Sequence, residues 1–354
     1  MPERTDNQVL INKQKSSSTI TSTTHAASRP NTDSSSQDIK RPSPVEAPAV
    51  GRKRALLCGV TYNSAGENII SRLEGPLNDV KEIKEMLIKH LGYTEECIRV
   101  LTDQEDNKNK STIPTKEGSK SGDSLVFFFS GHCVQCGVRH DEVPHGHSEN
   151  NMLIVNRTRS TETHDHVCLV DCTGKGMIPN SYINSTIVRP LKEGVTLHAI
   201  VDACHSGSIL DLNYKYEQQR AACSNDKGRW MDLSKAEKGT SGGLAICLSA
   251  CRDNETAPET NANSIGKGPA ETMGAMTYHL IQNIVTSNHP ANVTYEYILK
   301  KMHELRTVRN AHMDKTNYQK MSNLLRAFSE SRKIKEPVLS SSLNFDVSLQ
   351  KFLL

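Results

Sequence analysis

Thr196–Gly207 reads Thr-Leu-His-Ala-Ile-Val-Asp-Ala-Cys-His-Ser-Gly, and this stretch decides the fold. Its first part, Leu197–Val201, is a short apolar run of the kind that forms a buried strand. The run ends abruptly at Asp202, and polar residues follow. The thiol of Cys204 therefore stands just beyond the carboxyl end of a predicted strand, where open α/β sheets build their sites.

A second stretch has the same form, because the apolar run Leu125–Phe129 leads directly into Ser130-Gly131-His132. One strand followed by Cys and another followed by His indicate a Cys–His dyad, in which imidazole takes the thiol proton and the thiolate attacks a carbonyl carbon. A structural buried cysteine and an ordinary strand-end histidine are the alternatives. His205 adjoins Cys204, but successive side chains in extended structure point to opposite faces, which favours His132 as the base.

The remaining apolar patterns predict an α/β fold. Further strands are predicted at Ala55–Val60, Ile98–Leu101 and Gly243–Ser249. Helical spacing predicts helices at Asp79–His90, Met273–Val285 and Tyr295–Leu305. Asn78 or Asp79 is expected to cap the first helix and Thr294 the last. Because the strands are apolar throughout rather than alternating, we expect one twisted, mostly parallel sheet flanked by helices on both faces.

Composition narrows the possible partners and location. Hydrophobic residues make up 36% and charged residues 23% of the 354, which suits a globular core with additional polar segments. The net charge of +3 is too small to predict a nucleic-acid or membrane partner. We expect no membrane span and no signal peptide, and therefore a cytoplasmic protein that could also occur in the nucleus. The ten cysteines are accordingly interpreted as thiols rather than disulfides.

Taken together, these stretches resemble the type I plant metacaspases, which are caspase-like cysteine peptidases. The resemblance runs from about Arg54 to Leu354. It is strongest at Ala55–Tyr62, Asn78-Asp79, Phe127–His132, Ile183–Leu191, Leu197–Leu212, Gly242–Glu255, Gly274–Tyr278 and Glu336–Leu354. It implies the caspase-like fold and a role in programmed cell death or stress proteolysis.

The resemblance also implies a domain organisation. Residues 54–212 match the large-subunit region and 243–354 the small-subunit region, joined by the basic linker 213–242. Residues 1–53 form a Ser/Pro-rich tail without hydrophobic periodicity, for which we expect disorder. An enzyme that cleaves after basic residues could also cut itself within the exposed, Lys/Arg-rich linker.

Site roles follow from the same resemblance. Cys204 is the implied nucleophile and His132 the general base and acid, with the backbone N–H groups of Cys204 and Cys133 as the oxyanion hole. Asp79, Ser130 and Asp202 match an acidic pocket that accepts Arg or Lys. We therefore expect the protein to cleave protein or peptide substrates after Arg or Lys and not after Asp. A helix cap for Asp79 and a turn-capping role for Asp202 are the alternatives.

The chain departs from the family pattern near these residues. Cys133 stands where the family has Gly, and its side chain would cost on the order of 1 kcal/mol or more if the position needs positive φ or a close approach of the substrate. Asp171 and Asp211 match two calcium-ligand positions, but Asn180 and Ser181 replace an acidic pair, so we expect weakened or absent calcium activation. No organic cofactor is expected.

A third departure lies between two predicted strands. Relatives have an amphipathic crossover helix in the part of the chain that corresponds to 102–122, where this chain has almost no strong hydrophobes. Without that helix, one face of Leu125–Phe129 is expected to be open to solvent.

These departures support two other hypotheses. The chain could be a degenerate, inactive metacaspase that binds or regulates active relatives. Alternatively, Cys133, Cys136, Cys168 and Cys172 could bind zinc together with nearby histidines, although their spacing is not a regular zinc-finger pattern and a polar loop is the plainer interpretation of 134–167.

Overall fold

The computed structural model describes residues 51–63, 71–104, 118–137, 163–168, 177–218, 228–233, 238–261, 272–317 and 333–352. All of them belong to the unit Pro48–Leu354. The predicted tail 1–53 lies almost wholly outside the described residues, and its end, Lys53, already belongs to the first strand. The predicted domain boundaries remain predictions.

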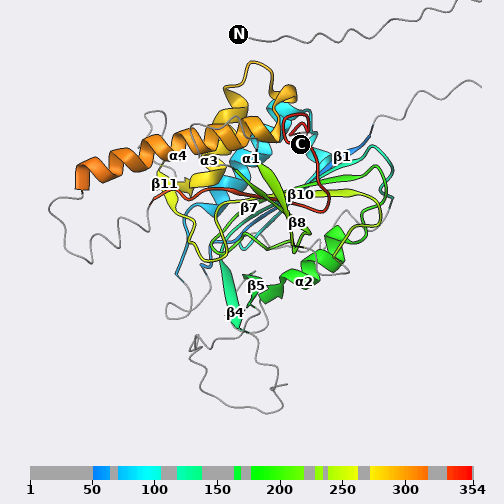
Figure 1. Ribbon diagram of the computed structural model, residues 1–354, viewed down its shortest axis with the longest axis horizontal. Helices are drawn as coiled ribbons and strands as arrows, with labels where there is room; N and C mark the ends of the chain where they lie inside the picture. The colour runs from blue at the N-terminus through cyan, green and yellow to red at the C-terminus, as the bar shows by residue number, and fades with distance from the viewer. Residues whose placement is uncertain are drawn as a thin grey trace, which may run out of the picture. The chain divides into compact units, whose positions relative to one another are not determined.

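An eight-stranded sheet with the order β2-β1-β3-β7-β10-β13-β8-β9 forms the centre of the fold (Figure 1). Its strands, in chain order, are β1 Lys53–Gly59, β2 Ile98–Thr102, β3 Ser124–Ser130, β7 Thr196–Asp202, β8 Tyr214–Glu217, β9 Arg229–Asp232, β10 Leu244–Ser249 and β13 Val338–Ser341. The first five strands in spatial order are parallel to one another. Each of the last three is antiparallel to the strand before it. The predicted mostly parallel sheet is therefore confirmed.

Two small sheets accompany it. They consist of β4 Cys133–Gly137, β5 Thr163–Cys168 and β6 Met177–Pro179, and of β11 Glu259–Asn261 with β12 Thr272–Gly274. Strands β4 and β5 overlap the two ends of 134–167, which was interpreted as a polar loop. Residues 138–162 between them lie outside the described part of the chain.

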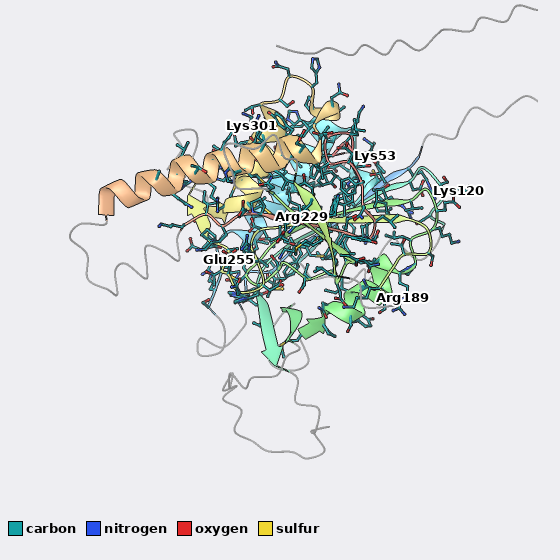
Figure 2. All side chains as sticks on the ribbon, in the orientation of Figure 1. Lys53, Lys120, Arg189, Arg229, Glu255 and Lys301 are labelled. Atoms are coloured by element: carbon teal, nitrogen blue, oxygen red, sulfur yellow. The ribbon has the colours of Figure 1, made fainter. Side chains whose placement is uncertain are left out.

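Helices cover both faces of the main sheet. They are α1 Pro76–Leu91, α2 Asn180–Ile183, α3 Ala275–Val285 and α4 Tyr295–Asn317, together with the short turns η1 Glu95–Cys97, η2 Asn184–Val188 and η4 Pro290–Asn292. Figure 1 shows α1, α3 and α4 on one side of the sheet and α2 on the other. Each side has its own apolar cluster, and side chains fill both layers (Figure 2). The layered arrangement predicted from the apolar strands is thus observed.

The first helix begins earlier than predicted. Its N-cap is Gly75, which has no capping side chain, and Pro76 occupies the first turn, where its missing N–H costs nothing. The prediction of Asn78 or Asp79 as cap was wrong, and the Asp79 carboxylate is left for another use. Thr294 does cap α4, since its Oγ1 accepts the N–H of Tyr297 at 3.3 Å.

Strand β3 is covered over most of both faces, with only Phe127 among its apolar residues partly exposed, so the prediction of an open face was also wrong. Val126 and Phe128 belong to the cluster under α1, α3 and α4. Leu125 and Phe129 belong to the opposite cluster, which includes Val188 of η2. A segment that follows β6 therefore contributes to covering the face that was expected to lie open. Residues 105–117 lie outside the described residues, so the missing crossover helix remains a prediction.

The predicted linker 213–242 is more than a connection. It contributes β8 and β9, which extend the main sheet beyond β13. Trp230 of β9 donates its indole N–H to the carbonyl of Phe345 at 2.8 Å, which ties this edge to the C-terminal segment.

The burial of the β3 face that carries Leu125 can be tested by measuring the free energy of unfolding. Leu125 is 3% exposed, so Leu125→Ala should lower the free energy of unfolding by about 2–5 kcal/mol, through lost transfer energy and a cavity. Leu349→Ala is the control, because Leu349 is 76% exposed and its truncation should cost less than about 0.5 kcal/mol. Urea denaturation measures both, and equal small effects would contradict a covered β3.

Candidate active site

The register of two neighbouring strands builds the site. In the parallel pair β3–β7, Ser130 lies opposite Asp202. His132 and Cys204 each follow two residues later, beyond the same edge of the sheet. All four side chains line one cavity. The two strands that the sequence marked separately are thereby brought together.

His132 is held from two directions. Its backbone N–H donates to the hydroxyl of Tyr62 at 2.8 Å, and its Nε2 lies 2.8 Å from the carbonyl oxygen of Ser71. A neutral imidazole that donates to Ser71 from Nε2 carries its lone pair on Nδ1. The contact therefore favours the tautomer in which Nδ1 can accept a proton.

Cys204 lies in the turn after β7 and is partly buried. Burial raises the pKa of its thiol, the N–H of Ala257 (3.3 Å from Sγ) lowers that pKa, and the nearby carboxylates of Asp202 and Glu259 raise it again. The net direction is upward, so the thiol is protonated at neutral pH. Nucleophilic use of Cys204 consequently requires a base.

His205 faces away from this chemistry. It has a left-handed backbone with φ of 51°, its N–H donates to the carbonyl of Glu255 at 3.0 Å, and its Nδ1 lies 2.6 Å from the carbonyl of Asp253. Figure 2 labels Glu255, whose loop holds this turn. These contacts hold the turn, and His205 is not among the residues that line the cavity.

Two buried carboxylates lie at the inner end of the cavity. Asp79 accepts the hydroxyl of Ser130 at 2.7 Å and the N–H of Gly274 at 2.9 Å. Asp202 accepts both the N–H and the hydroxyl of Thr277 at 2.8 Å, at the beginning of α3. Neither carboxylate has a described salt-bridge partner. The helix-cap alternative for Asp79 is thus excluded, while Asp202 does bond a helix N-terminus.

Burial raises the pKa of both carboxyls. The pKa of Asp79 lies well above its usual range, first because of burial and then because of the charge of Asp202. Burial raises the pKa of Asp202 to about 6, and hydrogen bonds from Thr277 oppose the shift. Ionising such a buried pair is costly when no cation is near. A positively charged group bound in the cavity would offset that cost.

Gly274 and Glu259 also line the cavity, and sequence reasoning missed both roles. A Cβ on Gly274 would lie 2.1 Å from Oδ2 of Asp202 and 3.0 Å from Oδ2 of Asp79, so only glycine fits between the two carboxylates. Glu259 is exposed, and its Oε1 accepts the N–H of Gly75 at 2.9 Å. A glycine directly before the apolar α3 was a sequence signal that could have revealed Gly274. Glu259 lies in a polar stretch of sequence whose pattern does not indicate a role.

The predicted oxyanion residue Cys133 begins β4, directly after His132. Its side chain is 3% exposed and packs in the apolar cluster on the α2 side. It is not among the described non-glycine residues with positive φ. The strain expected from a positive φ is therefore absent at this position.

The predicted metal ligands do not form a site among the described residues. The carboxylate of Asp211 pairs with the ammonium of Lys238, and Asn180 accepts the N–H of Ser181 at 2.7 Å. The part of the chain that the structure describes contains no group of three or more His, Cys, Asp or Glu side chains that could hold a metal ion. Asp171 lies outside it. An ion-paired Asp211 does not fit a calcium ligand.

The zinc hypothesis remains a prediction. The Cys133 thiol is buried in the apolar cluster on the α2 side. Cys136 and Cys168 lie on the paired strands β4 and β5, and Cys172 lies outside the described residues.

Comparison with known proteins identifies the class. The family model described as "Metacaspase, peptidase C14 domain" matches residues 53–213. Metacaspase-3 of Arabidopsis thaliana is 33% identical over 317 residues, covering 86% of this chain and 76% of the relative. Metacaspase-1 of the same plant is 35% identical over 325 residues, covering 86% and 79%, and its Metacaspase-2 is 36% identical over 276 residues, covering 72% and 56%.

Fold and sequence together define a caspase-like α/β protein of the cysteine peptidase class. More narrowly, the chain belongs to the metacaspase family. Within the described ranges, no helix combines the length and apolar character that crossing a membrane requires.

The raised pKa of Asp202 predicts a pH-dependent stability. Its folded pKa of about 6 exceeds the unfolded value near 3.9, so its stabilising contribution is full below about pH 4 and is lost as pH rises through 6. Asp202→Asn removes this loss. We expect the Tm of the variant, relative to the wild type, to be higher at pH 8 than at pH 5 by about 2–4 °C or more.

The control for this measurement is Glu193→Gln, which alters an exposed carboxylate. Its Tm difference from the wild type should be the same at both pH values. A pH-independent difference for Asp202→Asn as well would refute the proposed cost of ionising Asp202.

Proposed function

We propose that this metacaspase is a cysteine endopeptidase that cleaves peptide bonds after Arg or Lys. Cys204 is the nucleophile and His132 the general base and then acid. The observation that carries the proposal is a single cavity lined by the Cys204 thiol, the His132 ring and the buried carboxylates Asp79 and Asp202. A nucleophile with its base next to an anionic pocket suits acyl transfer from a basic residue.

The raised pKa of Cys204 sets the order of proton transfers. Because the thiol is protonated in the free enzyme, His132 takes its proton as Sγ attacks the carbonyl carbon. The imidazolium then gives the proton to the leaving amine, and the same ring activates the water that hydrolyses the acyl-enzyme. Backbone N–H groups of Cys204 and Cys133 are the proposed donors to the oxyanion.

The carboxylate pair supplies the proposed specificity. A guanidinium or ammonium group near Asp79 and Asp202 would offset both their desolvation and their mutual repulsion, whereas a substrate Asp would add a further negative charge. The hydroxyl of Ser130 orients Asp79 for this contact. Because the Asp202 and Glu259 charges raise the pKa of Cys204, a bound cation also makes its thiolate easier to form.

Natural partners and cellular role are proposed from family membership. Protein or peptide substrates with Arg or Lys at the cleaved position, other metacaspases as partners, and a role in programmed cell death or stress proteolysis follow from the relatives. The competing proposal of an inactive binding partner rests partly on Cys133, where the backbone lacks the positive φ that would have strained it. No step of the proposed reaction uses calcium.

Turnover of an Arg-terminated fluorogenic peptide tests the activity. Purified, folded protein should release the fluorophore, and Cys204→Ala should reduce the rate at least about a thousandfold, since the nucleophile is lost. The assay is run with calcium and with chelator, and we expect similar rates because Asp211 is paired with Lys238. Equal rates for the folded wild type and Cys204→Ala would support the inactive-partner alternative.

The acidic pocket predicts a pH-dependent KM. As pH falls through about 6, Asp202 is protonated and loses its attraction for a cation, so KM for an Arg peptide should rise. Asp202→Asn should raise KM for that peptide by about tenfold or more at pH 7.5, and should flatten its pH dependence between 5 and 7. Glu193→Gln serves as the control, and an unchanged KM in Asp202→Asn would contradict the assigned pocket.

A further inference from the structure

We propose that Tyr62 is a positioning residue for His132, and that Asp103 holds Tyr62 in the conformation this requires. The inference rests on the proposed use of His132 as base. It gives a role to two residues, one beyond β1 and one beyond β2. The sequence analysis gave neither a role, and neither lines the cavity.

Tyr62 is buried and strained. Its side chain lies in the apolar cluster on the α2 side and is 2% exposed, yet its φ is 63°, in the left-handed region that non-glycine residues rarely adopt. Its hydroxyl accepts the backbone N–H of His132 at 2.8 Å, and the two ring centroids are 4.7 Å apart. The tyrosine thus contacts both the main chain and the ring of His132.

Asp103 stabilises this unfavourable backbone. One carboxylate oxygen, Oδ2, accepts the N–H of Thr61 at 3.0 Å, the N–H of Tyr62 at 2.7 Å and the hydroxyl of Thr61 at 3.0 Å. Strand register places it there, since Gly59 of β1 lies opposite Thr102, the residue before Asp103. A carboxylate that accepts two consecutive N–H groups fixes the turn at 61–62, as strained residues at functional sites require.

The same turn also fixes the ring of His132. The carbonyl of Thr61 accepts the N–H of Leu73 at 3.1 Å. Leu73 is two residues from Ser71, whose carbonyl lies 2.8 Å from Nε2 of His132. One turn therefore anchors both partners of His132, the hydroxyl at its main chain and the carbonyl at its ring.

Gly131 provides independent support. A Cβ at this position would lie 2.9 Å from the hydroxyl oxygen of Tyr62 and 2.9 Å from the ring of Phe129. The residue before His132 must therefore lack a side chain for Tyr62 to come this close. Its φ is not in the left-handed region, so the requirement comes from the approach of Tyr62 and Phe129 and not from backbone strain.

The test is Tyr62→Phe, which keeps the ring and removes the hydroxyl that accepts the N–H of His132. Its matched control is Tyr295→Phe, which removes an equally buried hydroxyl that lies 2.7 Å from Nδ1 of His198, a residue that does not line the active-site cavity. Two readouts are used on full-length protein of checked folding. They are kcat and KM with an Arg peptide, and the pH profile of Cys204 alkylation by iodoacetamide, followed by mass spectrometry.

We expect Tyr62→Phe to lower kcat about tenfold with KM changed less than about twofold, because an unpaired N–H lets His132 shift without altering the acidic pocket. The alkylation profile of Cys204 should move to higher pH, since a displaced imidazole stabilises the thiolate less. Tyr295→Phe should change neither readout. Asp103→Asn should give the same pattern, and it provides a second variant should Tyr62→Phe fail to fold.

A Tyr62→Phe protein with the kcat and alkylation profile of Tyr295→Phe would overturn the proposal. If the wild type turns over no peptide, the proposed function fails, but alkylation still decides the positioning role. A shift of the Cys204 profile in Tyr62→Phe alone would then support it, and identical profiles in the two variants would refute it.

Discussion

The pairing of β3 with β7 is the constraint on which the rest of the site depends. Because the two strands are parallel and in register, Ser130 lies opposite Asp202, and the residues two positions further along each chain leave the sheet at the same edge. A shift of one residue would reverse the faces of either strand and separate the thiol from the imidazole. Burial of Phe128 and Ile200 on one face and of Leu125 and Val201 on the other holds that register.

Two buried carboxyl groups next to this strand pair lower the stability of the fold. Asp79 and Asp202 are buried carboxyls whose pKa is raised, and their described contacts are hydrogen bonds from neutral groups rather than a salt bridge. Packing alone would favour neutral side chains at these positions, because ionising a buried acid is costly. The cost is understandable if a cationic side chain enters the cavity, since its charge then completes an electrostatic arrangement that the free protein leaves incomplete.

Three described non-glycine residues have left-handed backbones, namely Tyr62, His205 and Asp211. Each lies in a loop that follows β1 or β7, and each is held by a contact from a distant part of the chain. Asp103 accepts a hydrogen bond from the N–H of Tyr62, and the carbonyl of Glu255 accepts one from the N–H of His205. Lys238 pairs with the carboxylate of Asp211. Among the described residues, backbone strain thus lies in the loops that follow β1 and β7, and tertiary contacts maintain it.

The sequence by itself predicted the five parallel strands of the main sheet, the helices α1, α3 and α4, and a histidine and a cysteine just beyond two strand ends, because apolar runs and the polar residues that end them are local signals. The tertiary structure alone decided what depends on distant contacts. It turned Asp79 from a supposed cap toward Ser130 and Gly274, added β8 and β9 to the sheet, and covered β3 with residues of η2. It also placed Glu259 and Tyr62 at the site, which no local pattern marks, since their partners lie far away in the chain and meet them only when the strands pair.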